Sequence, residues 1–250
     1  MTFKEKLHAG EILYGLTLTL GSPKIAEIIA HLGFDWIWIE AEHTTMSLED
    51  ILSQLQAVNG TTTTTIVRVD NNNATTIKRV LDTGPDGIIV PSVNTPDEAR
   101  QAIKALKYPP LGERGIGLGR AQAYGQTLGE YIKTANDKLV TLFMIEHITA
   151  VQNIEEILAV EGLDGVIVGS LDLAGSMNLQ NDLGNPLLEI EVQKVLAACL
   201  KAGVACGIFV GNAQQAKFRI DQGFRIVTLG ADVFLLATAA KSALDLVKAT

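Results

Sequence analysis

The stretch Leu139–Leu173, LVTLFMIEHITAVQNIEEILAVEGLDGVIVGSLDL, decides the fold of this chain. Its two apolar runs, Leu139–Ile145 and Gly165–Val168, are rich in β-branched residues and show no alternation of apolar and polar positions. Such runs are typical of parallel strands that are buried on both faces. The segment between them, Asn153–Val160, carries apolar residues at helical spacing. The stretch therefore predicts a strand, a helix and a second, parallel strand.

The same alternation of strand and helix continues through the rest of the chain. The expected strands are Ile12–Thr17, Phe34–Ile39, Ile66–Val69, Gly87–Val90, Leu139–Ile145, Gly165–Val168, Val204–Val210 and Arg225–Leu229. Parallel strands joined by helices form either an open doubly wound sheet or a closed barrel. Eight such units in 250 residues favour the (β/α)8 TIM barrel. We expect one domain over residues 1–250, with a last helix over Ala231–Ala249 that packs on, or is exchanged with, a partner subunit.

Composition narrows the possible partners. The chain is 47% hydrophobic and carries a formal net charge of −8 without any basic run, which argues against nucleic acid or an anionic membrane as a partner. Cys199 and Cys206 are the only cysteines and do not form a CxxC motif, so we expect reduced thiols. The N-terminus lacks the apolar core of a signal peptide, and no apolar run is long enough to span a membrane. We therefore expect a cytoplasmic protein.

Active sites of TIM barrels lie at the carboxyl ends of the strands. The polar residues expected at those ends are Glu40, Glu42, His43, Arg68, Asp70, Ser92, Asn94, Glu146, Ser170 and Asp172. Glu146 and Asp172 follow two neighbouring parallel strands, so their carboxylates should meet at one rim. Such a pair is either a metal site or an acid/base pair.

Two other kinds of site fit the sequence less well. Imine chemistry needs a desolvated lysine on a strand, and the candidate Lys138 falls at the start of a strand rather than at its end. A phosphate site after the last two strands would use Gly211 and Gly230, but each glycine is explained by a tight turn. The run Gly115–Gly119 is not a dinucleotide-binding motif, because it does not lie between a strand and a helix.

A divalent metal on Glu146 and Asp172 explains more of the polar residues expected at the carboxyl rim. Two carboxylates with open coordination positions suit Mg²⁺ or Mn²⁺, which a 2-oxo acid could chelate through its carboxylate and keto oxygens. The metal would stabilise the enolate formed when a C3 proton is lost or the C3–C4 bond breaks. Arg68 would neutralise the substrate carboxylate and the enolate oxygen, and His43 is the natural base.

The same residues also have purely structural interpretations. Asp172 could cap a helix, and Arg68 could pair with Glu40 or Glu42. What favours function is that four such residues, His43 among them, are expected on one rim. His8, His31 and His147 are assigned to surface or packing roles.

Four stretches give the chain a family resemblance. They are GFDWIWIEAEH (Gly33–His43), IIVPSVNTPDEA (Ile88–Ala99), KYPPLGERGIGLGRAQAYG (Lys107–Gly125) and Ile145–Met177. With these motifs the chain resembles the HpcH/HpaI family of metal-dependent class II 2-oxo acid aldolases, which includes 4-hydroxy-2-oxoheptanedioate aldolase and 2-dehydro-3-deoxyglucarate aldolase. The resemblance covers nearly the whole chain.

The resemblance implies a pyruvate site with a metal. Glu146 and Asp172 would bind a divalent ion, Mg²⁺, Mn²⁺ or Co²⁺, whose other positions are filled by water and the pyruvate-like donor. Ser170 and Leu171 fall where backbone groups line the pyruvate pocket in this family.

The resemblance also implies roles for residues farther from the metal. His43 would be the catalytic base and Arg68 the enolate-stabilising arginine. Asp82 matches an aspartate that reaches His43 of a neighbouring subunit. Such enzymes are homo-oligomers, hexamers built as trimers of dimers with an exchanged terminal helix, and the long apolar segment Ala231–Val247 is compatible with that exchange.

The chain departs from the family pattern beside the site. Met144 stands where glutamine is usual, Leu171 where alanine is usual and Glu40 where aspartate is common, and Thr44-Thr45 replaces a usual Gly-Pro. We interpret these changes as altered specificity, because every core catalytic residue remains.

The expected function is reversible cleavage of a 4-hydroxy-2-oxo acid to pyruvate and an aldehyde through a metal-stabilised enolate. The alternatives are a related decarboxylase or biosynthetic carboligase that uses the same enolate, and a catalytically silent metabolite-binding barrel. Exchange of the C3 protons of pyruvate would separate an enzyme from a silent binder.

Overall fold

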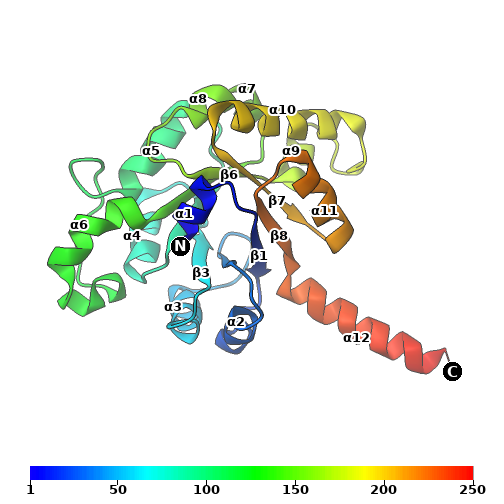
Figure 1. Ribbon diagram of the computed structural model, residues 1–250, viewed down its shortest axis with the longest axis horizontal. Helices are drawn as coiled ribbons and strands as arrows, with labels where there is room; N and C mark the ends of the chain where they lie inside the picture. The colour runs from blue at the N-terminus through cyan, green and yellow to red at the C-terminus, as the bar shows by residue number, and fades with distance from the viewer. Residues whose placement is uncertain (250) are drawn as a thin grey trace.

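The computed structural model describes residues 1–249 and forms a closed barrel of eight parallel strands (Figure 1). The strands are β1 (Leu13–Leu18), β2 (Trp36–Glu40), β3 (Thr64–Arg68), β4 (Gly87–Val90), β5 (Val140–Ile145), β6 (Gly165–Val168), β7 (Ala205–Val210) and β8 (Ile226–Ala231). Each strand pairs with the next one along the chain, and β8 pairs with β1. The predicted (β/α)8 barrel is therefore confirmed, with strand bounds that move by one or two residues at most ends.

The helices cover the outside of the barrel, apart from short ones at its two ends and from the last helix, which projects away from it (Figure 1). They are α1 (Phe3–His8), α2 (Pro23–Ala30), α3 (Leu48–Ala57), α4 (Ala74–Asp82), α5 (Pro96–Leu106), η1 (Arg120–Gly125), α6 (Leu128–Lys138), α7 (Ile148–Gln152), α8 (Ile154–Leu158), α9 (Ser170–Ser176), α10 (Pro186–Ala202), α11 (Ala213–Gln222) and α12 (Asp232–Lys248).

Capping residues explain where several of these helices begin. The hydroxyl of Ser47 accepts from the backbone N–H of Asp50, whose carboxylate accepts in return, and Thr95 and Glu98 form the same capping box on α5. Asn73 caps α4 with its side-chain oxygen. Such caps can be found in a sequence, because a cap depends only on residues within one turn of the chain.

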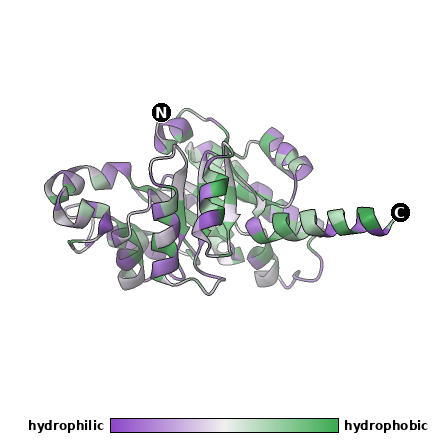
Figure 2. Ribbon diagram, turned by 90° about the horizontal axis from the view of Figure 1, so that it is seen from below, coloured by the Kyte–Doolittle hydropathy of each residue, from purple (hydrophilic) through white to green (hydrophobic). Residues whose placement is uncertain are grey.

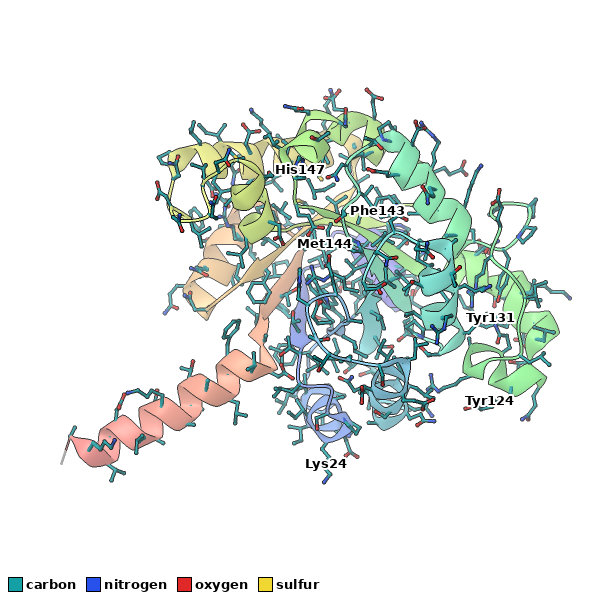
Figure 3. The ribbon with its side chains drawn as sticks, turned by 180° about the vertical axis from the view of Figure 1, so that it is seen from behind. Lys24, Tyr124, Tyr131, Phe143, Met144 and His147 are labelled. Atoms are coloured by element: carbon teal, nitrogen blue, oxygen red, sulfur yellow. The ribbon has the colours of Figure 1, made fainter. Side chains whose placement is uncertain are left out.

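The core has two layers, because successive strand residues point to opposite faces. On β5, Phe143 packs between the sheet and the helices, whereas Met144 belongs to the barrel interior with Trp36 and Trp38; Figure 3 labels both β5 residues. All five residues of β2 are buried. Burial on both faces is the reason that the strands read as continuous apolar runs.

Three elements differ from the sequence-based expectation. The helix expected over Asn153–Val160 is shorter, and α7 precedes it, with Asn153 as the break between α7 and α8. Helix α9, which was not predicted, begins directly after β6, so Asp172 lies in its first turn and Gly169, rather than Asp172, is the N-cap. Helix α1, which was not predicted, places Phe3 and Leu7 in the interior cluster at the amino end of the barrel.

Helix α12 leaves the barrel instead of packing on it. Figure 1 shows α12 projecting away from the other elements, and Figure 2 shows apolar residues along much of its length. Its exposed apolar side chains include Phe234 and Leu236, each 62% exposed. Within residues 1–249, no helix combines the length and apolar character needed to cross a membrane.

Candidate active site at the carboxyl rim of the barrel

Three charged residues meet at the carboxyl rim because their strands end there. Glu40 is the last residue of β2 and Arg68 the last of β3, and the two are paired in the parallel register. Glu146 follows the last residue of β5. All three are at least 92% buried, since their exposed fractions are 3%, 8% and 7%. Buried charges at a strand rim are costly unless they are paired or serve a ligand.

Arg68 is the cation that joins the acidic residues. Its Nε donates to Glu40 Oε2 at 2.6 Å, and its Nη1 lies 2.8 Å from Glu42 Oε2 and 4.0 Å from Glu146 Oε2. The structural interpretation of Arg68, pairing with Glu40 or Glu42, is therefore correct as far as it goes. Its Nη2, however, has no hydrogen-bond partner among residues 1–249, so one edge of the guanidinium remains for an anion.

Only one of the two carboxylate oxygens of Glu146 accepts a hydrogen bond. Its Oε1 accepts from the backbone N–H of Ser92 at 2.7 Å, and Ser92 adopts the left-handed conformation with φ 56°. Its Oε2 is buried and has no hydrogen-bond partner in the described chain. Burial raises the pKa of Glu146, against the Ser92 hydrogen bond and the charge of Arg68, which lower the pKa. A buried acid with a free oxygen is typical of a functional group rather than a structural one.

Asp172 supplies the second carboxylate of the predicted pair. It lies exposed in the first turn of α9, and its negative charge contributes to the raised pKa of Glu146. Within residues 1–249, no group of three or more His, Cys, Asp or Glu side chains gathers to hold a metal ion. A divalent ion on Glu146 and Asp172 would therefore keep most of its positions for water and substrate. The unpaired Oε2 of Glu146 fits such an ion.

Glu42 and His43 form the outer part of the rim. His43 has an exposed side chain, and its Nε2 lies 3.8 Å from Glu42 Oε2. Burial raises the pKa of Glu42 to about 7, with the charge of Arg68 opposing and that of Glu146 adding to the rise. Glu42 can therefore hold a proton near neutral pH.

Ser170 and Leu171 open α9 beside this rim. Leu171 is 65% exposed and Ser170 is half-buried. Gly169 precedes them and packs so closely on β5 that a Cβ there would lie 2.7 Å from Glu146 Cβ and 3.0 Å from Met144 Cε. Glycine is needed here because α9 starts against the side chain of Glu146.

Asp82 is the one predicted site residue that a single chain does not bring to the rim. It ends α4, and helices of this fold run back from the carboxyl rim, so a nine-residue helix carries Asp82 about 13 Å away. There Asp82 Oδ1 lies 3.4 Å from Arg114 Nη2, and Gly117 and Gly119 pack against it.

One contributor, Trp38, was missed in the sequence. Trp38 donates from Nε1 to Glu40 Oε2 at 3.0 Å, and its ring lies under the Arg68 guanidinium, 5.1 Å from ring centroid to Cζ. The two-residue spacing of Trp38 and Glu40 puts both on one face of a strand, which is a signal that was available. Ser92 was expected at this rim, but its left-handed conformation had no such signal, and the Glu146 carboxylate that accepts from its N–H lies 54 residues away in the sequence.

The fold and this rim define a class: a TIM-barrel enzyme with a buried arginine among carboxylates. Comparison with known proteins then places the chain within that class. Residues 13–239 match the family model described as HpcH/HpaI aldolase/citrate lyase, and the chain belongs to this family. It is an enzyme of the aldolase type.

Curated relatives and solved structures agree with this placement. The chain is 38% identical over 243 residues to a 4-hydroxy-2-oxo-heptane-1,7-dioate aldolase of Shigella sonnei, covering 96% of this chain and 92% of the relative. It is 36% identical to a 2-keto-3-deoxy-L-rhamnonate aldolase of Escherichia coli, over 98% of this chain and 92% of the relative. A crystal structure of a family protein from Burkholderia cenocepacia superposes with a TM-score of 0.95 at 37% identity, covering 98% of each chain.

Proposed function

We propose that this enzyme reversibly cleaves 4-hydroxy-2-oxo acids to pyruvate and an aldehyde. The observation that carries the proposal is a buried carboxylate oxygen without a hydrogen-bond partner, Glu146 Oε2, beside an arginine whose Nη2 makes no hydrogen bond within residues 1–249. The two groups lie 4.0 Å apart, measured from Arg68 Nη1 to Glu146 Oε2. The names of the relatives support the same chemistry.

The proposal includes a divalent metal, Mg²⁺, Mn²⁺ or Co²⁺. Glu146 and Asp172 are the residues that would hold it, since a cation would compensate the burial that raises the pKa of Glu146. When bound, the ion supplies Lewis-acid polarisation of the 2-oxo group.

The residues of the chain perform the remaining work. Arg68 presents Nη2 to the carboxylate of the substrate and to the enolate oxygen, where a buried cation stabilises developing negative charge. His43 accepts the proton of the C4 hydroxyl as the C3–C4 bond breaks, which releases the aldehyde and leaves the enolate. Protonation of the enolate at C3 then gives pyruvate. Ser170 and Leu171 would line the pyruvate pocket, with Leu171 and Met144 narrowing it.

We further propose that the enzyme is a homo-oligomer, a hexamer in the family pattern. The exposed apolar surface of α12 supports a partner subunit on this helix. The distance of Asp82 from its own rim supports the assignment that Asp82 of the partner subunit orients His43. The free, buried Cys199 and Cys206 fit the reducing cytoplasm.

Two assays test this function. With Mg²⁺, Mn²⁺ or Co²⁺, the enzyme should exchange the C3 protons of pyruvate in deuterated water and should release pyruvate from 4-hydroxy-2-oxoheptanedioate, and a chelator should stop both. Release of CO₂ from oxaloacetate, without release of pyruvate from 4-hydroxy-2-oxoheptanedioate, would indicate a decarboxylase instead. Absence of both exchange and cleavage would leave only a binding protein.

A variant of the central arginine tests the mechanism. Arg68→Ala should weaken the stabilisation of the transition state, measured through kcat/KM, by on the order of 3 kcal/mol. This is the scale for losing a partner of a developing oxyanion. Near-normal kinetics would refute the role of Arg68.

A further inference from the structure

Trp38 lies in the barrel interior directly below the candidate site. It is 3% exposed, and it belongs to the interior cluster that contains Met144. Its indole N–H donates to Glu40 Oε2, and its ring underlies Arg68. A buried indole finds a hydrogen-bond partner in most proteins, and here that partner is the carboxylate that also holds Arg68.

The carboxylate of Glu40 is fully engaged. Its Oε2 accepts from Trp38 Nε1 at 3.0 Å and from Arg68 Nε at 2.6 Å. Its Oε1 accepts from the backbone N–H groups of Glu42 at 2.8 Å and His43 at 2.9 Å. A carboxylate offers about four lone-pair sites, so Glu40 has no oxygen left to accept a substrate proton. Glu40 therefore acts by holding other groups.

We propose that Trp38 and Glu40 form a positioning unit that sets the orientation of Arg68 and of the backbone that carries His43. The unit rests on the proposed function of Arg68 and His43. Without it, Arg68 would turn toward its other two acidic neighbours, Glu42 and Glu146, and Nη2 would no longer face the substrate. Catalytic charges are effective only when neighbouring groups hold them in place before the substrate binds.

Trp36 provides a matched control for Trp38. The two indoles stack at 6.3 Å between centroids and are the only tryptophans of the chain. Trp36 is fully buried, but its Nε1 has no hydrogen-bond partner in the described chain. Replacing either tryptophan by phenylalanine therefore removes a similar volume from the same core, and only Trp38→Phe removes a hydrogen bond to Glu40.

The experiment compares Trp38→Phe with Trp36→Phe by steady-state kinetics of the aldol cleavage and by thermal melting. We expect Trp38→Phe to lower kcat about tenfold, the effect of loosening a preorganised charge, with a smaller change in KM. Trp36→Phe should keep kcat within about twofold despite a comparable loss of melting temperature, because it leaves the Glu40 contacts intact. Equal kinetic losses in the two variants would overturn the proposal.

Chemical rescue gives a second readout that a purely structural role would not move. In Arg68→Ala, added guanidinium ion should recover part of the activity, because Trp38 and Glu40 still form a binding site for it. In the double variant Arg68→Ala/Glu40→Gln, that binding site has lost its negative charge, and we expect no recovery of activity. Equal rescue in the two backgrounds would show that Glu40 does not position the guanidinium.

The outcomes separate this inference from the proposed function. Full activity of Arg68→Ala without any rescue agent would remove the proposed function of Arg68, and the inference with it. An inactive Arg68→Ala combined with equal behaviour of Trp38→Phe and Trp36→Phe would remove only the positioning unit. Fluorescence of Trp36→Phe, whose remaining indole is Trp38, should change when pyruvate and Mg²⁺ are added together, since the ligand would sit on the arginine above that ring.

Discussion

At the scale of single residues, Glu146 is a costly feature of the site. Its Oε2 is buried without a hydrogen-bond partner, and burial raises its pKa. A chain selected for stability alone would have no reason to keep such a group. A bound cation would reverse this cost, so the residue makes sense as a ligand.

The raised pKa of Glu146 leads to a prediction about metal binding. Because the apo carboxyl holds its proton to a higher pH than an ordinary glutamate, divalent ions should displace that proton and bind more weakly as the pH falls. Calorimetric titration with Mn²⁺ in two buffers of different ionisation heat measures the protons released. Glu146→Gln should lose both the release and most of the affinity, and Asp172→Asn should lose affinity. Binding unchanged in both variants would exclude these ligands.

Glu42 leads to a prediction about stability. Its pKa is raised from 4.5 to about 7 in the folded chain, so the unfolded chain gives up its proton at lower pH. The free energy of unfolding should therefore be highest, for this group, below pH 4.5 and should fall until the pH passes 7.

Glu42→Gln should remove this fall in the free energy of unfolding with rising pH. Relative to the parent, the variant should gain on the order of 1 kcal/mol between pH 5 and pH 8, a value reduced for the partial solvent exposure of the group. Denaturant unfolding with a chelator present measures the gain. A stability difference that does not change with pH would contradict the assignment.

At the scale of elements, the junction of β6 and α9 brings Asp172 to Glu146. This junction works because Gly169 has no side chain, and a Cβ there would lie 3.1 Å from Glu146 Oε2. The helix can then start against β5, with Asp172 in its first turn.

Gly169→Ala should therefore displace Glu146 and lower metal-dependent activity at least about tenfold, the usual result of moving a catalytic group by a fraction of an ångström or more. Gly175→Ala in the same helix is the matched control, because nothing lies within 4 Å of its Cβ. The control should keep its activity and gain roughly 0.5 kcal/mol from the loss of backbone freedom in the unfolded chain. Kinetics and melting of both proteins test the pair, and equal activities would contradict the role of Gly169.

At the scale of the whole molecule, a single chain is incomplete in two respects. Helix α12 projects from the barrel with apolar residues exposed (Figure 1), and Asp82 lies far from the rim that it is proposed to serve. A neighbouring subunit would cover the apolar residues of α12 and would place its own rim next to Asp82.

Subunit mixing tests the shared site. His43→Ala and Asp82→Ala should each be nearly inactive alone, whereas co-expressed chains should recover about a quarter of the parental activity, because random assembly pairs an intact His43 with an intact Asp82 in that share of sites. Mixtures that stay as inactive as the separate variants would place Asp82 outside the active site.

Helix α12 should control assembly. Leu236→Glu places a charge on a side chain that is 62% exposed in the single chain, and it should yield a smaller particle with lower activity. Lys241→Gln, on the same helix, loses only a surface ion pair with Asp245 and should keep the parental mass. Sedimentation velocity distinguishes the two, and parental mass in Leu236→Glu would argue against assembly through α12.

The sequence by itself determined the barrel and most of its rim. Continuous apolar runs, helical periodicity and local caps such as Ser47 and Thr95 predict each βα unit from neighbouring residues alone. The position of Arg68 and Glu146 at strand ends then follows, because parallel strands bring their carboxyl ends to one rim.

Only the tertiary structure decided how those residues are held. The bond from Arg68 to Glu40, the bond from the left-handed Ser92 to Glu146 and the start of α9 against the side chain of Glu146 depend on contacts between elements that are distant along the chain. The direction of α12 also depends on contacts, since its apolar residues would suit packing on its own barrel equally well. Sequence periodicity reports which face of an element is apolar, but the partner of that face is chosen by packing in three dimensions.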